Sequence, residues 1–277
     1  MRFTKMQGIG NDYIYVNCFE ENIADPETVS IKVSDRHFGI GSDGLVLIMP
    51  SDKADLRMRI FNADGSEAKM CGNASRCIGK YAYERGLVTK DTITLETNSG
   101  IKVLHLDTDG GKVKSVSVDM GRAVFEPAAI PIASSEPMIL SPITAGGITY
   151  TATAVSMGNP HCVIFGEDPD TIALESKGRE LEFHPMFPDR VNVEFAHIVS
   201  EDTIKMRVWE RGSGETLACG TGACATAAAA VKNGYCPTEK EIHLLLRGGT
   251  LSITIHEDFA VTMRGGAEIV FDGEIQL

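Results

Sequence analysis

Two cysteines stand at matching places in the chain, each at the start of a glycine-containing turn that opens onto a helical pattern. Cys71 lies in MCGNASRC and Cys219 in ACGTGAC. The unpaired N–H groups at a helix start favour a thiolate or a bound carboxylate, so we expect them to lower the pKa of both thiols from the ordinary value of about 8.5. A phosphate loop would carry a lysine after its glycines, and neither segment does. The turns therefore predict a site for an anion such as a carboxylate.

An internal repeat relates the two cysteines to each other. Three pairs of segments match at one constant offset of 148 residues: GN at 10–11 and 158–159, LRMR at 56–59 and IKMR at 204–207, and CG at 71–72 and 219–220. Several matches in a single register, without a gap, indicate two copies of one folding unit.

The elements around these turns are mostly strands with period-two alternation of apolar residues. Two clear helices are predicted at about 73–85 and 221–233, each closed by a glycine, and weaker ones near 26–37 and 168–180. The fold class expected is α/β (α+β), with two pseudo-symmetric, mainly-β domains that each wrap around a central helix.

The domain boundaries follow from the repeat. We expect the first domain to comprise residues 1–118 together with 265–277, and the second to comprise residues 119–264. The tail AEIVFDGEIQL follows the last hairpin of the second copy and has strand character, so we expect it to cross back and complete the first domain.

A thiol from each of two similar domains suits the inversion of a carbon acid. One group removes the proton from one face of the carbon, and the other returns a proton to the opposite face. We expect Cys71 and Cys219 to form this acid/base pair across the cleft between the domains. Four backbone amides follow the cysteines and can hold the α-carboxylate while charge develops on it: those of Gly72, Asn73, Gly220 and Thr221.

Other readings of the cysteines remain open. A zinc site would need the pairs Cys71/Cys77 and Cys219/Cys224, whose spacing is wider than in usual structural sites. A redox dithiol of Cys71 and Cys219 is a further alternative, although the chain has no C-x-x-C motif. We expect the remaining cysteines to be buried apolar residues: Cys18, Cys77, Cys162, Cys224 and Cys236.

The composition of the chain bears on which partners it binds and on its cellular compartment. The 277 residues carry a net charge of −12, which argues against nucleic acid or an anionic membrane as a partner. The sequence shows no signal peptide and no apolar stretch long enough to span a bilayer. We expect a cytoplasmic protein with reduced thiols.

Four segments together resemble a known family. FNADGSEAKMCGN, MGNPHCV, VNVEF and ERGSGETLACGTGA are similar to the signature segments of diaminopimelate epimerase, a family of cofactor-independent amino-acid racemases. The resemblance runs over essentially the whole chain. It implies the diaminopimelate epimerase-like fold, a homodimer, no cofactor and no metal, and the interconversion of LL- and meso-diaminopimelate in lysine and peptidoglycan-precursor biosynthesis.

The resemblance also implies roles for individual residues. Cys71 and Cys219 would exchange proton-transfer roles, and His161 and Glu210 would tune the thiols. The substrate-binding set would be Asn11, Asn62, Gly72, Asn73, Asn159, Asn192, Glu210, Arg211, Gly220 and Thr221. An asparagine after a glycine can also serve a turn, and His161 can also be a hydrogen-bonded core histidine.

Two positions bear on how far the resemblance extends. Some family members carry glutamine at the position of Gly44, so no side-chain contact is assigned there. The related proline-racemase group usually has histidine where this chain has Asn73, which favours diaminopimelate over proline as the substrate.

Overall fold

A computed structural model describes all residues from 1 to 277. The chain divides into two compact units, one of Met1–Asp119 with Arg264–Leu277 and one of Met120–Met263. The expected functional domains, 1–118 with 265–277 and 119–264, stay a prediction, because compactness alone does not show which segments fold independently. No helix in either unit is long and apolar enough to cross a membrane.

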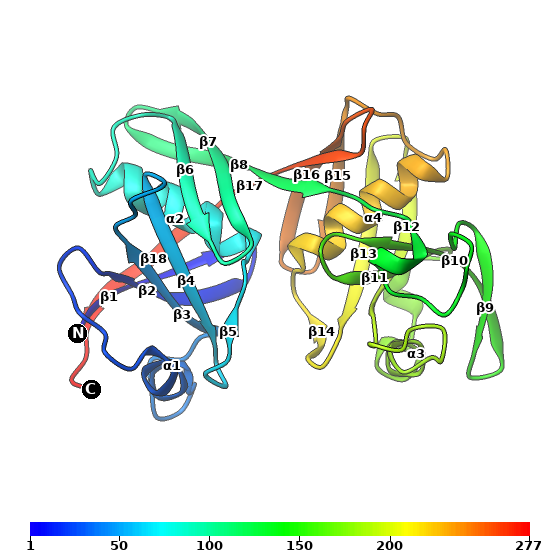
Figure 1. Cartoon of the computed structure of the whole chain (residues 1–277), viewed down its shortest axis with the longest axis horizontal. Coiled ribbons are helices and arrows are strands. Elements are labelled where there is room, and N and C mark those ends of the chain that lie inside the picture. Colours follow the sequence, from blue (N-terminus) through cyan, green and yellow to red (C-terminus); the bar gives the residue numbers. More distant parts are fainter. The chain divides into compact units, whose positions relative to one another are not determined.

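The first unit is a strand-rich layer around one buried helix (Figure 1). Its elements are β1 (Arg2–Gly8), β2 (Asn11–Asn17), α1 (Pro26–Ser34), β3 (Gly44–Met49), β4 (Leu56–Asn62), β5 (Glu67–Ala68), α2 (Gly72–Glu84), β6 (Thr92–Thr97), β7 (Gly100–Asp109), most of β8 (Lys112–Arg122) and β18 (Glu268–Glu274). Strand β18, from the C-terminal tail, pairs antiparallel with β1. Strand β2 pairs antiparallel with β1 and parallel with β3, and β4 pairs antiparallel with β3 and parallel with β6.

The second unit repeats this layout. Its elements are β9 (Ser141–Ala145), β10 (Ile148–Ser156), β11 (Pro160–Phe165), α3 (Leu174–Glu182), β12 (Asn192–Ser200), β13 (Thr203–Glu210), β14 (Gly214–Thr216), α4 (Gly220–Lys232), β15 (Glu241–Leu246), β16 (Gly249–Ile255) and most of β17 (Ala260–Gly265). Strand β11 pairs antiparallel with β10 and parallel with β12, and β13 pairs antiparallel with β12 and parallel with β15. The order and sense of pairing are those of the first unit, so the predicted fold class is confirmed.

Both helices of each unit keep the offset found in the sequence. Helix α4 begins and ends 148 residues after α2, and α3 begins and ends 148 residues after α1. The clear helices begin one residue before their predicted starts. The weaker ones differ more: α1 ends at Ser34, where Asp35 accepts hydrogen bonds from the amides of His37 and Phe38.

The helix predicted at 168–180 is partly wrong. Residues Pro169–Thr171 form a separate 3-10 turn capped by Asp168, and α3 begins only at Leu174. A short polar residue that binds nearby backbone amides favours a turn over a continuing helix.

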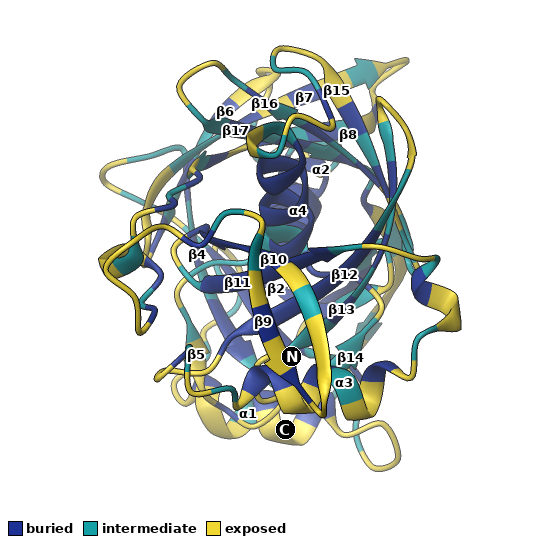
Figure 2. Ribbon diagram, turned by 90° about the vertical axis from the view of Figure 1, so that its right-hand side faces the viewer, coloured by how far each residue is buried: buried dark blue, intermediate teal, exposed yellow.

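The central helices are buried on nearly all sides. Every residue of α2 from Gly72 to Ala82 is buried, and the helix contacts β1, β7 and β18. Helix α4 contacts β10 to β13, β15 and β16, and its alanines allow the strands to approach closely. Figure 2 shows α2 and α4 as buried, whereas α1 carries exposed residues. This burial fixes the N-terminal ends of α2 and α4, where the two cysteines lie.

Candidate active site

Both predicted cysteines are the residues that immediately precede a central helix. Cys71 precedes α2 with an extended backbone (φ −140°, ψ 120°), and Cys219 precedes α4 with nearly the same one (φ −120°, ψ 110°). The amides expected to hold a carboxylate belong to the first two residues of each helix. No two cysteines of the chain are joined by a disulfide.

The Cys71 half-site, consisting of Cys71, Asn11 and Asn73, is formed by three of the predicted residues. The Cys71 thiol donates to Asn11 Oδ1 at 3.5 Å, and Asn73 Nδ2 donates to the same oxygen at 3.3 Å. Asn11 is the first residue of β2, so the β1–β2 turn brings its amide to the start of α2.

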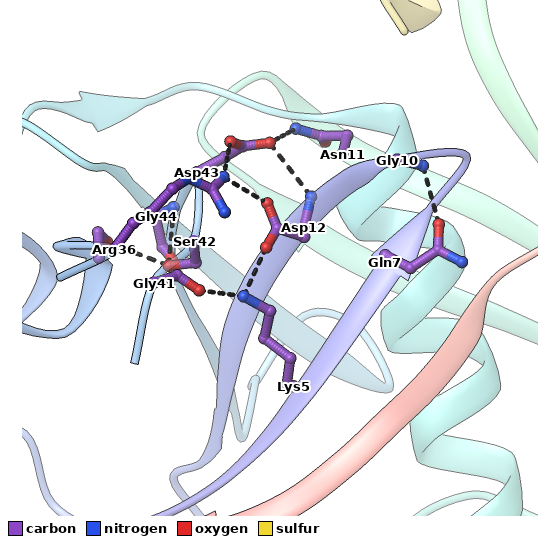
Figure 3. Close-up of polar contacts among 11 residues, drawn as sticks. Lys5, Gln7, Gly10, Asn11, Asp12, Arg36, Gly41, Ser42, Asp43 and Gly44 are labelled. Carbon is purple, nitrogen blue, oxygen red and sulfur yellow. Dashed lines mark hydrogen bonds and ion pairs between the residues drawn. The ribbon is translucent and has the colours of Figure 1, made fainter. Parts of the chain in front are cut away.

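An acidic residue that the sequence analysis missed anchors Asn11. Asp43 Oδ2 accepts hydrogen bonds from Asn11 Nδ2 at 2.7 Å and from the Asp12 amide at 3.1 Å. Its other oxygen accepts from Arg36 Nη2 at 2.9 Å, and Figure 3 shows how Arg36 also reaches Asp12, which in turn pairs with Lys5. Burial and the Asp12 charge raise the pKa of the Asp43 carboxyl. Because Asp43 takes the Asn11 NH₂ group, the Asn11 oxygen faces the Cys71 thiol.

The Cys219 half-site, consisting of Cys219, Thr221 and Asn159, occupies the positions 148 residues after those of the Cys71 half-site, with Thr221 in place of Asn73. The Gly222 amide donates to Cys219 Sγ at 3.3 Å, and Thr221 Oγ1 lies 3.5 Å from the same sulfur. Asn159 Nδ2 donates to Thr221 Oγ1 at 3.3 Å.

A fully buried pair lies behind Asn159. His161 Nε2 lies 3.0 Å from Asn159 Oδ1, and His161 Nδ1 lies 2.7 Å from Glu194 Oε1. Both side chains of this pair are 0% exposed. The sequence analysis named His161 but missed Glu194, although a glutamate inside the apolar strand VNVEF is itself a signal, since a buried carboxylate needs a partner.

The expected lowering of both thiol pKa values is wrong for Cys219. Burial raises the pKa of the Cys219 thiol well above its ordinary value, and the negative charges of Glu210 and Glu194 raise it further. The hydrogen bonds from Thr221 and Gly222 lower it, but they do not offset burial. A dipole at a helix start contributes only about 0.3–2 kcal/mol, which desolvation can exceed.

Three further predicted residues lie together where β12 begins and β13 ends. Asn192 Nδ2 donates to the Pro160 carbonyl at 2.9 Å, and Asn192 Oδ1 accepts from the Arg211 amide at 2.9 Å. The Arg211 guanidinium is exposed and donates to the Asp189 carbonyl at 2.9 Å. The Glu210 carboxylate accepts from the Thr216 hydroxyl. The Asn192 side chain therefore orders the backbone that carries Arg211.

The predicted residue Asn62, and Gly44, to which no contact was assigned, stand apart from these clusters. Asn62 Nδ2 donates to Ser66 Oγ at 3.0 Å, so the structure gives this amide a partner within its own turn. At Gly44, an added Cβ would overlap the Phe61 carbonyl oxygen, so this backbone leaves no room for a side chain.

The remaining cysteines lie mostly in the core. Cys77, Cys162 and Cys224 are 0% exposed and Cys236 is 6% exposed, whereas Cys18 is only partly buried. No group of three or more histidine, cysteine, aspartate or glutamate side chains gathers in a way that could hold a metal ion.

Comparison with known proteins gives consistent matches over the whole chain. A family model described as diaminopimelate epimerase matches residues 3–126 and 153–270. The chain is 54% identical to the diaminopimelate epimerase of Acetivibrio thermocellus, over 100% of this chain and 99% of that protein. It is also 54% identical to the diaminopimelate epimerase of Desulfovibrio desulfuricans, over 99% of this chain and 98% of that protein. Among solved structures, a probable proline racemase from Agrobacterium radiobacter matches with a TM-score of 0.73 at 15% identity, covering 100% of this chain and 93% of the other, which shows a shared fold.

Proposed function

The chain belongs to the diaminopimelate epimerase family and is an isomerase, and we propose that it interconverts LL- and meso-2,6-diaminopimelate with two cysteines as the acid and the base. The observation that supports this most strongly is the pair of half-sites. Each copy of the fold carries a cysteine immediately before a buried helix, with an asparagine from the matching turn beside that helix start.

The proposed reaction is one proton removal and one proton return. The thiolate of one cysteine takes the α-proton, and the electron pair left on carbon spreads into the α-carboxylate. The amides of Gly72, Asn73, Gly220 and Thr221 stabilise that charge because they are fixed at helix starts. The thiol of the other cysteine then protonates the opposite face of the carbon. In the reverse reaction the two cysteines exchange roles.

The polar residues around the half-sites have separate proposed roles. His161 and Glu210 tune the thiols, which agrees with the effect of the Glu210 charge on the pKa of Cys219. Arg211 binds the carboxylate at the distal end of the substrate, for which its exposed guanidinium is suited. The remaining side chains proposed to bind the substrate are Asn11, Asn62, Asn159, Asn192 and Glu210.

The wider setting is also part of the proposal. We expect a homodimer in the cytoplasm that acts in lysine and peptidoglycan-precursor biosynthesis without a cofactor.

A zinc-binding or redox module is the rival class. It predicts metal bound after purification, or a disulfide that opens and closes during function, and elemental analysis separates the metal-binding case.

The test is exchange of the substrate α-proton with solvent in deuterium oxide, measured with diaminopimelate, proline and glutamate. We expect exchange and epimerisation with LL-diaminopimelate and neither with proline or glutamate. We also expect loss of turnover in both Cys71→Ser and Cys219→Ser. Full turnover in either variant would contradict the two-thiol mechanism. Turnover of proline in place of diaminopimelate would assign the chain another substrate.

A further inference from the structure

The turn that carries Arg211 is exposed, but buried side chains hold its backbone. Residues 211–213 join β13 to β14, and all three are exposed. The Gly212 amide donates to Glu182 Oε1 at 2.9 Å, and Glu182, the last residue of α3, is only 3% exposed. The neighbouring Arg211 amide donates to Asn192 Oδ1 at 2.9 Å. Two consecutive amides of an exposed turn are therefore bound by buried side chains.

A second donor fixes the Glu182 carboxylate. Trp209 Nε1 donates to Glu182 Oε2 at 2.7 Å, and Arg190 Nη1 lies 3.5 Å from Glu182 Oε1. The Trp209 side chain packs closely on α3, because a Cβ added at Gly178 would lie 2.6 Å from two of its atoms. An indole N–H and a backbone N–H can only donate, so the directions of both hydrogen bonds to the carboxylate are fixed. One carboxylate oxygen is held by Trp209, and the other faces Gly212.

This arrangement belongs to only one copy of the repeat. At the offset of 148 residues, the position of Glu182 is occupied by Ser34. Arg211 corresponds to Ala63, so the first copy carries no cation there. The turn of the first copy is closed by its own Asp64, whose side chain accepts two hydrogen bonds from the same segment. The shared fold therefore does not require a buried carboxylate at this place, and the carboxylate occurs in the copy whose turn carries a guanidinium.

A held backbone reduces what Arg211 must lose when it binds a carboxylate. An arginine on a free turn would have to order its backbone and its side chain together at binding. Here the amides of Arg211 and Gly212 are already bound, and Arg211 Nη1 donates to the Asp189 carbonyl at 2.9 Å. The backbone on both sides of the Arg211 Cα is therefore ordered before a ligand arrives.

We propose that Glu182 is a positioning residue for Arg211: its carboxylate binds the Gly212 amide and so holds the turn from which the guanidinium reaches the distal carboxylate of the substrate. The inference rests on the proposed function of Arg211 in substrate binding. In this role Glu182 contacts no substrate atom.

The expected signature is a change in KM with kcat retained. The distal carboxylate takes no part in the proton transfers, so Arg211 binds it equally in the ground state and in the transition state. Glu182→Leu removes both acceptor oxygens and keeps a side chain of similar size. It should raise KM for LL-diaminopimelate about tenfold, the factor expected when one backbone residue must be ordered at binding.

Trp209→Phe is the matched control. It removes the indole donor but leaves Glu182 to bind the Gly212 amide, and the first copy carries Phe61 at the equivalent position. Its KM should rise much less than that of Glu182→Leu. An equal rise in both variants would trace the effect to the packing of α3 on β13 and would overturn the proposal.

A cycle of variants tests whether Glu182 acts through Arg211. Arg211→Ala alone should raise KM, and adding Glu182→Leu should raise it no further. A further tenfold rise in the combined variant would overturn the proposal, as would an unchanged KM in Glu182→Leu when Arg211→Ala raises it. An unchanged KM in Arg211→Ala would overturn the proposal together with the role of Arg211 on which it rests.

A last measurement uses the wild-type protein without substrate. Hydrogen exchange of the Gly212 amide is followed by NMR of 15N-labelled glycine, with the signal assigned by its absence in Gly212→Ala. We expect exchange at least about tenfold slower than in an unstructured peptide, and loss of this protection in Glu182→Leu. Unprotected exchange in the wild type would overturn the proposal. Because no turnover is needed, this result separates failure of the Glu182 role from failure of the proposed epimerase reaction.

Discussion

Gly222, in the first turn of α4, is the position where one added methyl group should disturb the chemistry most with the least damage to the fold. An added Cβ would lie 2.8 Å from Glu194 Oε1 and 3.3 Å from both Cβ and Sγ of Cys219, whereas ordinary contact begins at 3.4 Å. Gly222→Ala therefore requires the carboxylate or the sulfur to move by several tenths of an ångström.

Neither neighbour can move at low cost. Glu194 is buried and held by His161 at 2.7 Å, and the Cys219 sulfur accepts from the Gly222 amide itself. The first copy carries Ala74 at the equivalent position, with Val46 in place of Glu194. An alanine is accommodated there, so the restriction at Gly222 arises from the carboxylate.

The magnitudes predict a small loss of stability and a larger loss of rate. Alanine in a helix is favoured over glycine by about 1 kcal/mol, and overpacking costs about 1–3 kcal/mol, so the net destabilisation is about 0–2 kcal/mol. A reacting group displaced by about 1 Å can lose about 100-fold in rate, so a shift of roughly half that size should lower kcat about tenfold.

The assay measures kcat for LL-diaminopimelate together with the free energy of unfolding in urea. Gly79→Ala in α2 is the matched control, since its Cβ would meet the flexible end of Leu106 at 2.9 Å and lies in the other half of the repeat. We expect kcat to be retained in Gly79→Ala and to fall in Gly222→Ala. An unchanged kcat in a folded Gly222→Ala would refute the reasoning about close contact at Cys219.

Three further predictions concern pH, stability and oxidation. Because the Glu210 charge helps to raise the pKa of Cys219, Glu210→Gln should move the pH profile of Cys219 alkylation to lower pH, and a shift to higher pH would count against this. Burial opposes ionisation of Glu84, but hydrogen bonds from the Val113 amide and from lysines lower the pKa of its carboxyl overall. The ionised carboxylate therefore stabilises the fold above the pKa that Glu84 has in the unfolded chain, and this stabilisation is lost as pH falls. Glu84→Gln should therefore cost about 1–3 kcal/mol in urea unfolding at neutral pH, with a gap to the wild type that narrows below about pH 4; a constant gap would exclude the ionised form as its source. Diamide should inactivate the enzyme by oxidising Cys71 and Cys219 to a disulfide, and dithiothreitol should restore activity; inactivation without a Cys71–Cys219 linked peptide in mass spectrometry would contradict this.

The parts of the fold that the sequence predicts best are those with a strong local pattern. The starts of α2 and α4 follow from the glycines after Cys71 and Cys219 and from the match between the two copies. The end of α1 and the start of α3 were misplaced because they depend on Asp35 and Asp168 binding nearby backbone amides.

The missed site residues depend on contacts between distant segments. Asp43 meets Asn11 because β2 and β3 pair in parallel, and Glu194 meets His161 because β11 and β12 do the same. Neither pairing can be read from a local pattern. The raised pKa of Cys219 was missed for a related reason. The sequence shows that Cys219 precedes a helix, but it does not show that the thiol is buried.

The central claim is that two different thiols serve the two faces of one carbon, and early-time isotope placement tests it most directly. LL-diaminopimelate is incubated with the enzyme in deuterium oxide, and substrate and product are separated and analysed by mass spectrometry while little substrate has been converted. The account predicts one deuterium in the meso product and none in the remaining LL substrate, because the acid that protonates the new face has equilibrated with solvent. Product that retains the original hydrogen, or substrate that gains deuterium as fast as product, would indicate a single base and contradict the account.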